Sequence, residues 1–475
     1  MTSSRRSEAG SLAERSGAGP RRTRGGSPVG EASVLVFRRW LAAILLGAVI
    51  LRAGLLFYAE GHRATFDFPD SHRYVLVARN IAAGRGPIES DAVRAGTDPL
   101  YPLVLSLGIR LGADDAAAVM RFGRIVNVFF AVVSILILAA LTRRLVGPRA
   151  ALIAAALLAV DPILLFFNAL VLTETFYISL LLAGFYGVVR LGEAWLPERT
   201  GWKPVPQELP VPQVLPVSQK TSLSQKSLAT RLLWACMAGG CIGLGTLVRS
   251  SNLLMPLVLA PLVWFFARGE ANEPSRRRLG VVVCFLLMSI VPLVPWAVRN
   301  YRVFGDLVLT RSGGGASLME ALGPWADGGP GMDRIVYPEF PDGADELTRD
   351  RLCRTAAIEW AKSHPWAAAR LAWVKMRRTW SITLHATVYS STLYRVICWL
   401  SVTPVFVLAL VGIWRLRRHR AIVGLLLLPA VYFTLVHVVF VGSVRYRLPA
   451  VPMLFVLAAT GLSAGLHSET RLREE

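Results

Sequence analysis

The sequence predicts an all-α polytopic membrane protein with about ten transmembrane helices. Of the 475 residues, 54% are hydrophobic and only 17% are charged. Apolar runs of about 20 residues recur along the whole chain, and each is long enough to cross a bilayer core of roughly 30 Å as a helix. The expected spans are 38–58, 119–141, 150–168, 173–190, 230–248, 251–267, 279–298, 392–414, 420–441 and 447–466.

The positive charge follows these spans. The net charge of +21 is spread over short Arg-rich segments between apolar runs, which argues against a nucleic-acid-binding surface. With a cytoplasmic N-terminus, all the short, strongly basic segments fall on the cytoplasmic side, as the positive-inside rule requires. The Arg- and Ala-rich composition is typical of a bacterium with a GC-rich genome. We therefore expect a multi-pass protein of the cell inner (plasma) membrane, with both termini in the cytoplasm.

The connections between the spans divide the chain into segments. The first apolar run is too long for the core of a signal peptide, so we expect it to be retained as a span. In the larger outer excursion, apolar residues near helical spacing predict an amphipathic helix from Asp345 to about Trp380. The expected segments are a disordered cytoplasmic tail (1–34), an N-terminal transmembrane module (35–298) with a first outer loop (59–118) and a cytoplasmic Pro-rich linker (192–229), an extracytoplasmic cap (299–391), C-terminal transmembrane helices (392–466) and a cytoplasmic tail (467–475).

Two carboxylates mark the point where the chain leaves the first span. The stretch FDFPDSHRYVLVARNIAAGRG contains Asp67 and Asp70. Pro69 sets a turn, Asp70 or Ser71 can cap the helix that follows, and Gly84 can end it. Asp70 can therefore be interpreted either as a helix cap or as a functional carboxylate.

Other charged residues are expected on the same outer face. Glu174 in LTETFY can face a cavity at the membrane edge, or can simply favour a helix start. Arg249 in TLVRSSN can snorkel to headgroups or bind a lipid phosphate. Further candidates in PWAVRNYRVFG and SVRYRLPAVP are Arg299, Asn300, Arg445 and Arg447.

These residues come from separate connections between the expected spans, and all are expected near the same depth at the outer membrane surface. Acids with several arginines at a lipid interface suit an anionic lipid headgroup together with a general base. Asp161 lies within an apolar run, where Asp-Pro can mark a structural break. The five cysteines form no CxxC pair and the seven histidines form no HExxH motif, so neither a disulfide framework nor a metal site is predicted.

Six segments, in this order, carry a resemblance to a known family. They are PDSHRYVLVARNIAAGRG with DPLYPLVL, LTETFYISLLL, GLGTLVRSSNLLMPL, VPWAVRNYRVFG and VRYRLPAVPML. The chain resembles membrane glycosyltransferases of the GT-C class, in particular bacterial relatives of protein O-mannosyltransferases and of the aminoarabinose transferase for lipid A. The resemblance implies a GT-C-like helical bundle with an extracytoplasmic helical cap.

The resemblance also implies an activity. A hexosyl or pentosyl group would pass from a polyprenyl-phosphate donor to an extracytoplasmic acceptor (glycan, lipid or protein), with inversion at the anomeric carbon. Asp70 matches the essential acid of the first outer loop, and Asp67 is a weaker candidate. Tyr74 and Tyr101 either line the substrate cleft or anchor the interface. Some relatives use an acidic pair with a divalent metal (Mg or Mn). The spacing here is D-x-x-D rather than D-x-D, so a divalent metal stays an open alternative and no cofactor is assigned.

Two other functions remain open. A transporter or flippase of a lipid-linked substrate should place ionisable groups near the bilayer midplane in broken helices. A non-catalytic membrane scaffold would use the cap for binding, and would tolerate Asp70→Asn.

Overall fold

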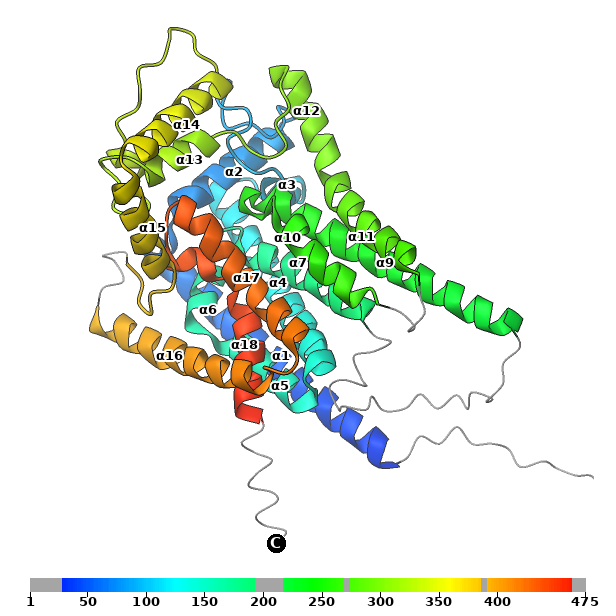
Figure 1. The fold of residues 1–475 in the computed structure, drawn as a ribbon. Coiled ribbons are helices and arrows are strands. Elements are labelled where there is room, and N and C mark those ends of the chain that lie inside the picture. Colours follow the sequence, from blue (N-terminus) through cyan, green and yellow to red (C-terminus); the bar gives the residue numbers. More distant parts are fainter. Residues whose placement is uncertain (1–27, 193–216, 269–273, 386–390, 464–475) are drawn as a thin grey trace, which may run out of the picture.

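The computed structural model describes residues 28–192, 217–268, 274–385 and 391–463, and these fold into helices with no strand among them (Figure 1). Within these described residues, seven helices are long and apolar enough to span a membrane, which confirms a multi-pass membrane protein. They are α1 (Pro28–Gly61), α4 (Ala116–Leu145), α7 (Glu174–Leu191), α9 (Val217–Val248), α11 (Ser275–Ile290) continuing into α12 (Val294–Phe304), α16 (Thr392–Arg415) and α17 (Arg420–Val439).

The other three expected spans depart from a single straight helix. The span expected at 150–168 is a pair, α5 (Pro148–Val160) and α6 (Pro162–Ala169), bent by 51° at Asp161. The spans expected at 251–267 and 447–466 are the shorter apolar helices α10 (Met255–Phe266) and α18 (Val451–Ser463). A helix of 13 residues such as α18 extends only about 20 Å, less than the bilayer core.

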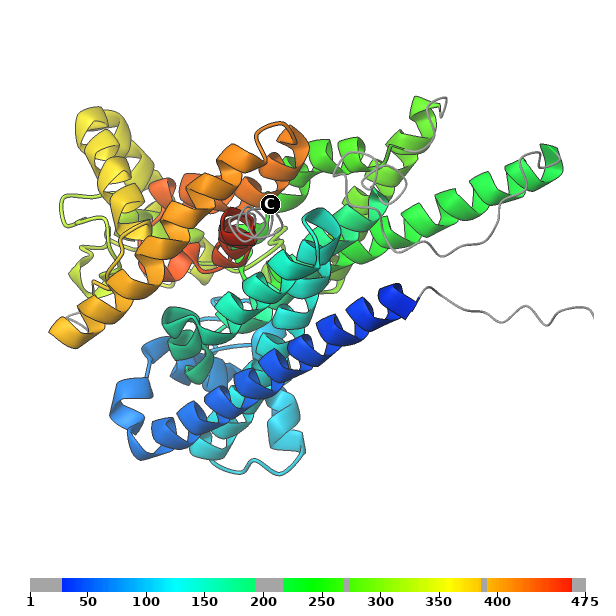
Figure 2. The ribbon, with the colours of Figure 1, turned by 90° about the horizontal axis from the view of Figure 1, so that it is seen from below.

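The helix α18 lies inside the bundle, packed against α16 and α5, while α7 packs between α4 and α9. Close contact between α16 and α18 depends on two glycines. A Cβ atom on Gly412 would collide with the Leu457 carbonyl oxygen, and one on Gly461 with that of Leu408. Small residues that let backbones approach are typical of helix packing in lipid. By contrast, α1 runs along one edge of the bundle (Figure 2), with little of its surface covered.

The outer segments form short helices that place the site. The first excursion contains α2 (Pro69–Ala82) and α3 (Leu100–Arg110), and the predicted stop is confirmed because Gly84 takes a positive φ of 76°. The cap contains α13 (Gly314–Ala321), α14 (Glu346–Ser363) and α15 (Pro365–Thr379). The Glu346 carboxylate accepts hydrogen bonds from the Arg94 and Ala95 amides at 2.7 and 3.2 Å, which fixes the cap over the first excursion.

Three boundary predictions need correction. The single helix expected from Asp345 to Trp380 is two helices, because Pro365 cannot continue α14 and instead starts α15. The helix α1 begins at Pro28, inside the tail predicted to be disordered, and α9 begins at Val217, inside the predicted linker. No proline follows Pro216 before Val248, so nothing in this stretch blocks a helix. The predictions for 1–27, 193–216 and 467–475 concern residues outside the described part.

Candidate active site

A buried carboxylate with two arginines lies where three distant parts of the chain meet. Glu174 is the first residue of α7 and its side chain is fully buried. Its Oε1 accepts a hydrogen bond from Arg249 at 2.8 Å and another from Arg445 Nε. Its Oε2 has no hydrogen-bond partner among the described residues. Charge-assisted bonds of this kind, and the α7 N-terminus, offset the cost of burying the charge.

Arg445 connects this pair to Asp70. Its Nη1 donates to Asp70 Oδ2 at 2.7 Å, so one guanidinium bridges the two carboxylates. The helix α2 starts at Pro69, the N-cap position is Phe68 and there is no side-chain cap bond. The prediction that Asp70 could serve as the N-cap is therefore wrong, because the carboxylate is turned toward Arg445 instead.

The charge of Arg445 controls the ionisation of Asp70. Burial alone would raise the pKa of Asp70, but the positive charge and hydrogen bond of Arg445 outweigh it and hold the pKa below its usual value. Asp70 is thus ionised at neutral pH, and its side chain is still 32% exposed. An ionised and accessible carboxylate is able to accept a proton from a ligand.

Aromatic rings surround the ion pairs. Arg445 lies over the Phe68 ring at 5.3 Å, and Arg249 lies over the Tyr446 ring at 5.7 Å. Tyr446 stacks on His437 with ring centroids 4.0 Å apart. Burial and the Asp70 carboxylate raise the pKa of Tyr74 to about 12, so its hydroxyl stays protonated at neutral pH.

A third arginine, Arg311, stands beside the cluster. It acts electrostatically on Asp70, Asp98 and Glu320. Its hydrogen bonds go only to hydroxyl oxygens, those of Ser250 and Ser317, both at 3.3 Å. Asp98 accepts from the Ser250 amide at 2.9 Å, and so fixes the segment that holds Arg311. Among the described residues, Arg311 therefore faces the site without an ion pair.

Several predicted site residues lie elsewhere. Asp67 pairs with His72 at 2.6 Å, away from the Arg445 bridge. Arg299 donates to the Arg94 carbonyl oxygen at 2.8 Å, and Asn300 donates to that of Val308 at 2.9 Å. These bonds hold loops together. Tyr101 is buried and donates to Asn127 at 3.3 Å, with its ring edge-on to Tyr74 at 5.4 Å.

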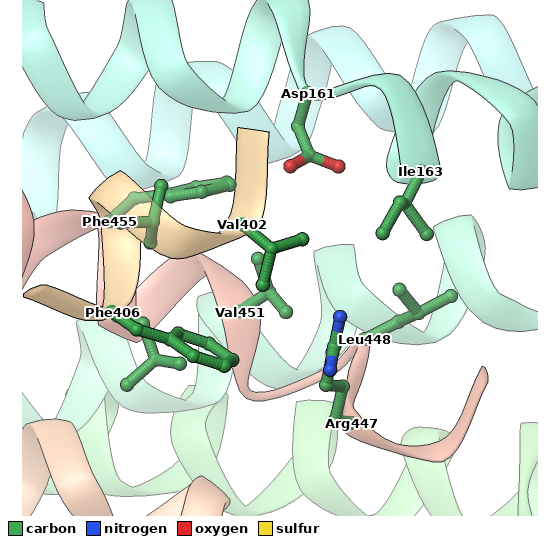
Figure 3. Close-up of a pocket in the computed structure, with 10 residues that line it drawn as sticks. Asp161, Ile163, Val402, Phe406, Arg447, Leu448, Val451 and Phe455 are labelled. Atoms are coloured by element: carbon green, nitrogen blue, oxygen red, sulfur yellow. The ribbon is translucent and has the colours of Figure 1, made fainter. Parts of the chain in front are cut away.

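Arg447 points into a separate small cavity, of about 20 Å³, with Asp161 on the opposite wall (Figure 3). It is almost fully buried and donates to the backbone carbonyl oxygens of Thr379 and Ser381. Asp161 caps α6, accepting a hydrogen bond from the Leu164 amide at 2.8 Å. The Asp-Pro break is thus structural, and Arg447 lies apart from the Glu174 pair.

A divalent metal does not fit the residues around Asp70. Its nearest charged partners are arginines, and Asp67 is engaged with His72. Throughout the described ranges, no three His, Cys, Asp or Glu side chains lie close enough together to hold a metal ion. Hard divalent cations prefer several oxygen ligands, so no step is assigned to a metal.

Sequence reasoning missed Arg311, Tyr446 and Asp98. Tyr446 lies between Arg445 and Arg447, which are both predicted site residues, and Asp98 is in the segment DPLYPLVL. Arg311 precedes the Gly-rich segment GGGAS, which the sequence predicts to be a turn; in the structure Gly313 caps α13 and the rest of the segment is helical. No local signal could show that this part of the chain folds back onto Ser250.

Comparison with known proteins adds a family signal and a fold. Residues 96–200 match the family described as dolichyl-phosphate-mannose-protein mannosyltransferase. This segment includes Asp98 and Glu174 and excludes Asp70 and Arg445. A comparison with curated protein sequences gives no match.

Solved structures share the architecture. The archaeal oligosaccharyltransferase AglB from Archaeoglobus fulgidus, in complex with an inhibitory peptide and a dolichol-phosphate, overlaps with a TM-score of 0.53 and 16% identity, over 92% of this chain and 52% of that chain. The apo form of the Archaeoglobus fulgidus oligosaccharyltransferase gives 0.52 and 16%, over 91% and 52%. This chain thus spans about half the length of those proteins.

A further match is ArnT from Cupriavidus metallidurans bound to undecaprenyl phosphate, with a TM-score of 0.36 and 16% identity, over 90% of this chain and 77% of that chain. At 16% sequence identity, the oligosaccharyltransferase matches show a shared fold. The family match over residues 96–200 and the shared fold of the oligosaccharyltransferases both agree with the resemblance that the sequence motifs carry.

Proposed function

We propose that this protein transfers a sugar from a polyprenyl-phosphate donor to an acceptor (glycan, lipid or protein) on the extracytoplasmic face, by an inverting mechanism with Asp70 as general base. The observation that carries the proposal is the Asp70–Arg445–Glu174 bridge, which holds an ionised carboxylate beside arginines. The match to the dolichyl-phosphate-mannose-protein mannosyltransferase family and the fold shared with an oligosaccharyltransferase in complex with a dolichol-phosphate support the donor class.

The proposed step balances without a further reactant. Asp70 takes the proton of the acceptor hydroxyl as the hydroxyl oxygen bonds to the anomeric carbon. The bond from that carbon to the phosphate oxygen breaks on the opposite side, and the polyprenyl phosphate leaves with the electron pair. Because the pKa of Asp70 is lowered, it is a weaker base than a free aspartate; contact with the ligand in place of Arg445 would strengthen it.

The arginines have different proposed roles. Arg249 and Arg445 already neutralise Glu174 and Asp70, so they orient these acids. Arg311 has only hydroxyl partners among the described residues, and is left to stabilise the charge of the departing phosphate. Fixed cations in a site with little water are effective for this purpose.

The membrane placement is part of the proposal. The positive-inside pattern supports cytoplasmic termini and an inner-membrane location, which puts α2 and the cap outside. A transporter should instead line a passage with charges at the bend between α5 and α6. There, Arg52 donates to the Ala159 carbonyl oxygen at 2.9 Å and Asp161 caps α6, which supports a structural role for both.

The test is transfer from a panel of radiolabelled polyprenyl-phosphate sugars by purified wild type and Asp70→Asn, with donor binding measured separately. We expect the wild type to use one donor and Asp70→Asn to bind that donor without transfer. Equal transfer by both proteins would exclude Asp70 as the base. Donor binding without transfer by the wild type would favour a transporter or a scaffold.

A further inference from the structure

A second cavity, of about 720 Å³, lies where α15 ends, below the cap. It is far larger than the cavity at Asp161. Figure 1 shows α15 descending from the cap toward the start of α16 at one side of the molecule. The helix α16 is long and apolar enough to span a membrane, and a span that starts here would place the cavity at the edge of the bilayer.

Two arginines give the lining of this cavity a positive charge, and the histidine beside them is neutral at pH 7. Arg377, Arg378 and His385 contribute to its wall. None of the three side chains donates a hydrogen bond or forms an ion pair within the described residues, and the buried Nε of Arg378 has no partner. Burial lowers the pKa of His385, and the nearby positive charges of Arg378 and Arg447 lower it further. The local potential is therefore positive.

No carboxylate within the described part neutralises these arginines. The acid on which Arg378 acts is Asp327, but Asp327 Oδ2 is bonded to Arg334 at 2.8 Å. The hydrogen bond from Arg334, more than the charge of Arg378, lowers the pKa of Asp327 to about 2. An anion entering the cavity would thus meet guanidinium groups with free donors.

The remaining walls are apolar and fixed to the membrane helices. They include Val374, Trp380 and Ile382. Trp380 donates to Thr434 of α17 at 2.8 Å and packs on Phe406 of α16 at 6.0 Å between ring centroids. A ligand that fits this lining needs a charged group and a hydrocarbon part.

The outer surface of α15 has the composition of a helix at a lipid interface. Trp366 and Trp373 are exposed, at 87% and 58%, and the exposed Arg370 and Arg377 share their helical stripe. Exposed tryptophans with arginines on one helix are typical of membrane-surface helices. In a water-facing cap, such large exposed rings would have no partner.

We infer that this cavity binds the phosphate headgroup of an acidic phospholipid from the surrounding bilayer, held by Arg377 and Arg378, with its chains against α15 and α16. The site is separate from the Asp70 cluster, and is proposed whatever that cluster catalyses. Its consequence is that an acidic lipid anchors the cap to the membrane.

The test uses the purified full-length chain, without any sugar donor. Native mass spectrometry and co-sedimentation with vesicles of phosphatidylglycerol or phosphatidylcholine measure bound lipid. The probe variant is Arg377→Gln/Arg378→Gln. The matched control, Arg349→Gln/Lys362→Gln, removes two exposed positive charges from α14. Thermal unfolding checks that both variants are folded.

We expect the wild type to prefer phosphatidylglycerol, and the probe variant to lose about five-fold in binding per arginine removed, while the control stays near wild type. Equal losses in probe and control would mean general charge attraction and would overturn the site. So would unchanged binding by the probe variant. Displacement by equimolar inorganic phosphate would show a free-anion site, and preferential displacement by polyprenyl phosphate would assign the cavity to the donor; either result overturns the inference.

Discussion

Two regions of this protein contain the same charged groups, one buried carboxylate and two arginines that are mostly shielded from solvent, but use them differently. At the outer edge, Glu174 bonds directly to Arg249 and Arg445. At the bend between α5 and α6, Asp161 bonds to a helix N-terminus, while Arg52 and Arg447 donate to backbone carbonyl oxygens. Side chains paired only with one another can exchange partners with a ligand, whereas groups that satisfy the backbone hold the fold. Burial of charge alone therefore does not identify a site; its partners do.

The largest expected effect separates the two regions by activity. Asp70→Asn should reduce kcat for sugar transfer by about 10²- to 10⁴-fold, the usual contribution of a general base. Asp161→Asn should leave kcat within about two-fold, since an amide oxygen can still cap α6. Both are measured by single-turnover transfer with a saturating donor. A comparable loss in both variants would mean that the bend, too, participates in catalysis.

A second prediction concerns stability. Arg445→Gln leaves Glu174 and Asp70 without a shared cation, and should destabilise the fold by about 3–5 kcal/mol, as expected for breaking a buried pair. The double variant Asp70→Asn/Arg445→Gln also removes the carboxylate that is left without a partner, while Arg249 stays paired with Glu174, and it should recover part of this loss. Thermal unfolding in one detergent compares the three proteins. A double variant less stable than Arg445→Gln would contradict the pairing.

The third prediction is a pH dependence. Arg445 lowers the pKa of Asp70, so Asp70 stays ionised as the pH falls through the usual aspartate value of about 3.9. Its contributions to activity and to stability are present above that value and are lost only as the pH falls through the lower, folded-state pKa. In Arg445→Lys, whose single ammonium cannot bridge both acids, the acid limb of kcat/KM should move to higher pH. An unmoved limb would show that another group controls it.

The smallest effect is expected at the helix cap. Asp161→Ala should cost about 1 kcal/mol through loss of the α6 cap, and Asp161→Asn clearly less. Chemical or thermal unfolding in matched detergent measures the difference. Equal losses would mean that the charge of Asp161, and its distance from Arg52 and Arg447, matter more than the cap.

Much of the site could be anticipated from local patterns. The sequence predicts four residues of the site because each is a charged residue at the expected outer membrane edge, where burying a charge is costly and usually serves a function. They are Asp70, Glu174, Arg249 and Arg445. Arg447 satisfies the same criterion as Arg445 but, two residues further along the same turn, it points into the cavity that faces Asp161. Arg299 and Asn300 likewise hold loops, and their sequence neighbours do not reveal which backbone oxygens they reach.

The sequence by itself determined the membrane-spanning character, the stop at Gly84 and the break at Asp161-Pro162, because hydrophobic length, positive φ and proline act within a few residues of the chain. Only the tertiary structure decided which charges meet. Arg445 is 375 residues from Asp70 and 271 from Glu174, and Arg311 reaches the cluster through Ser250. Such contacts depend on how the helices pack, and no local preference encodes the distance between residues so far apart.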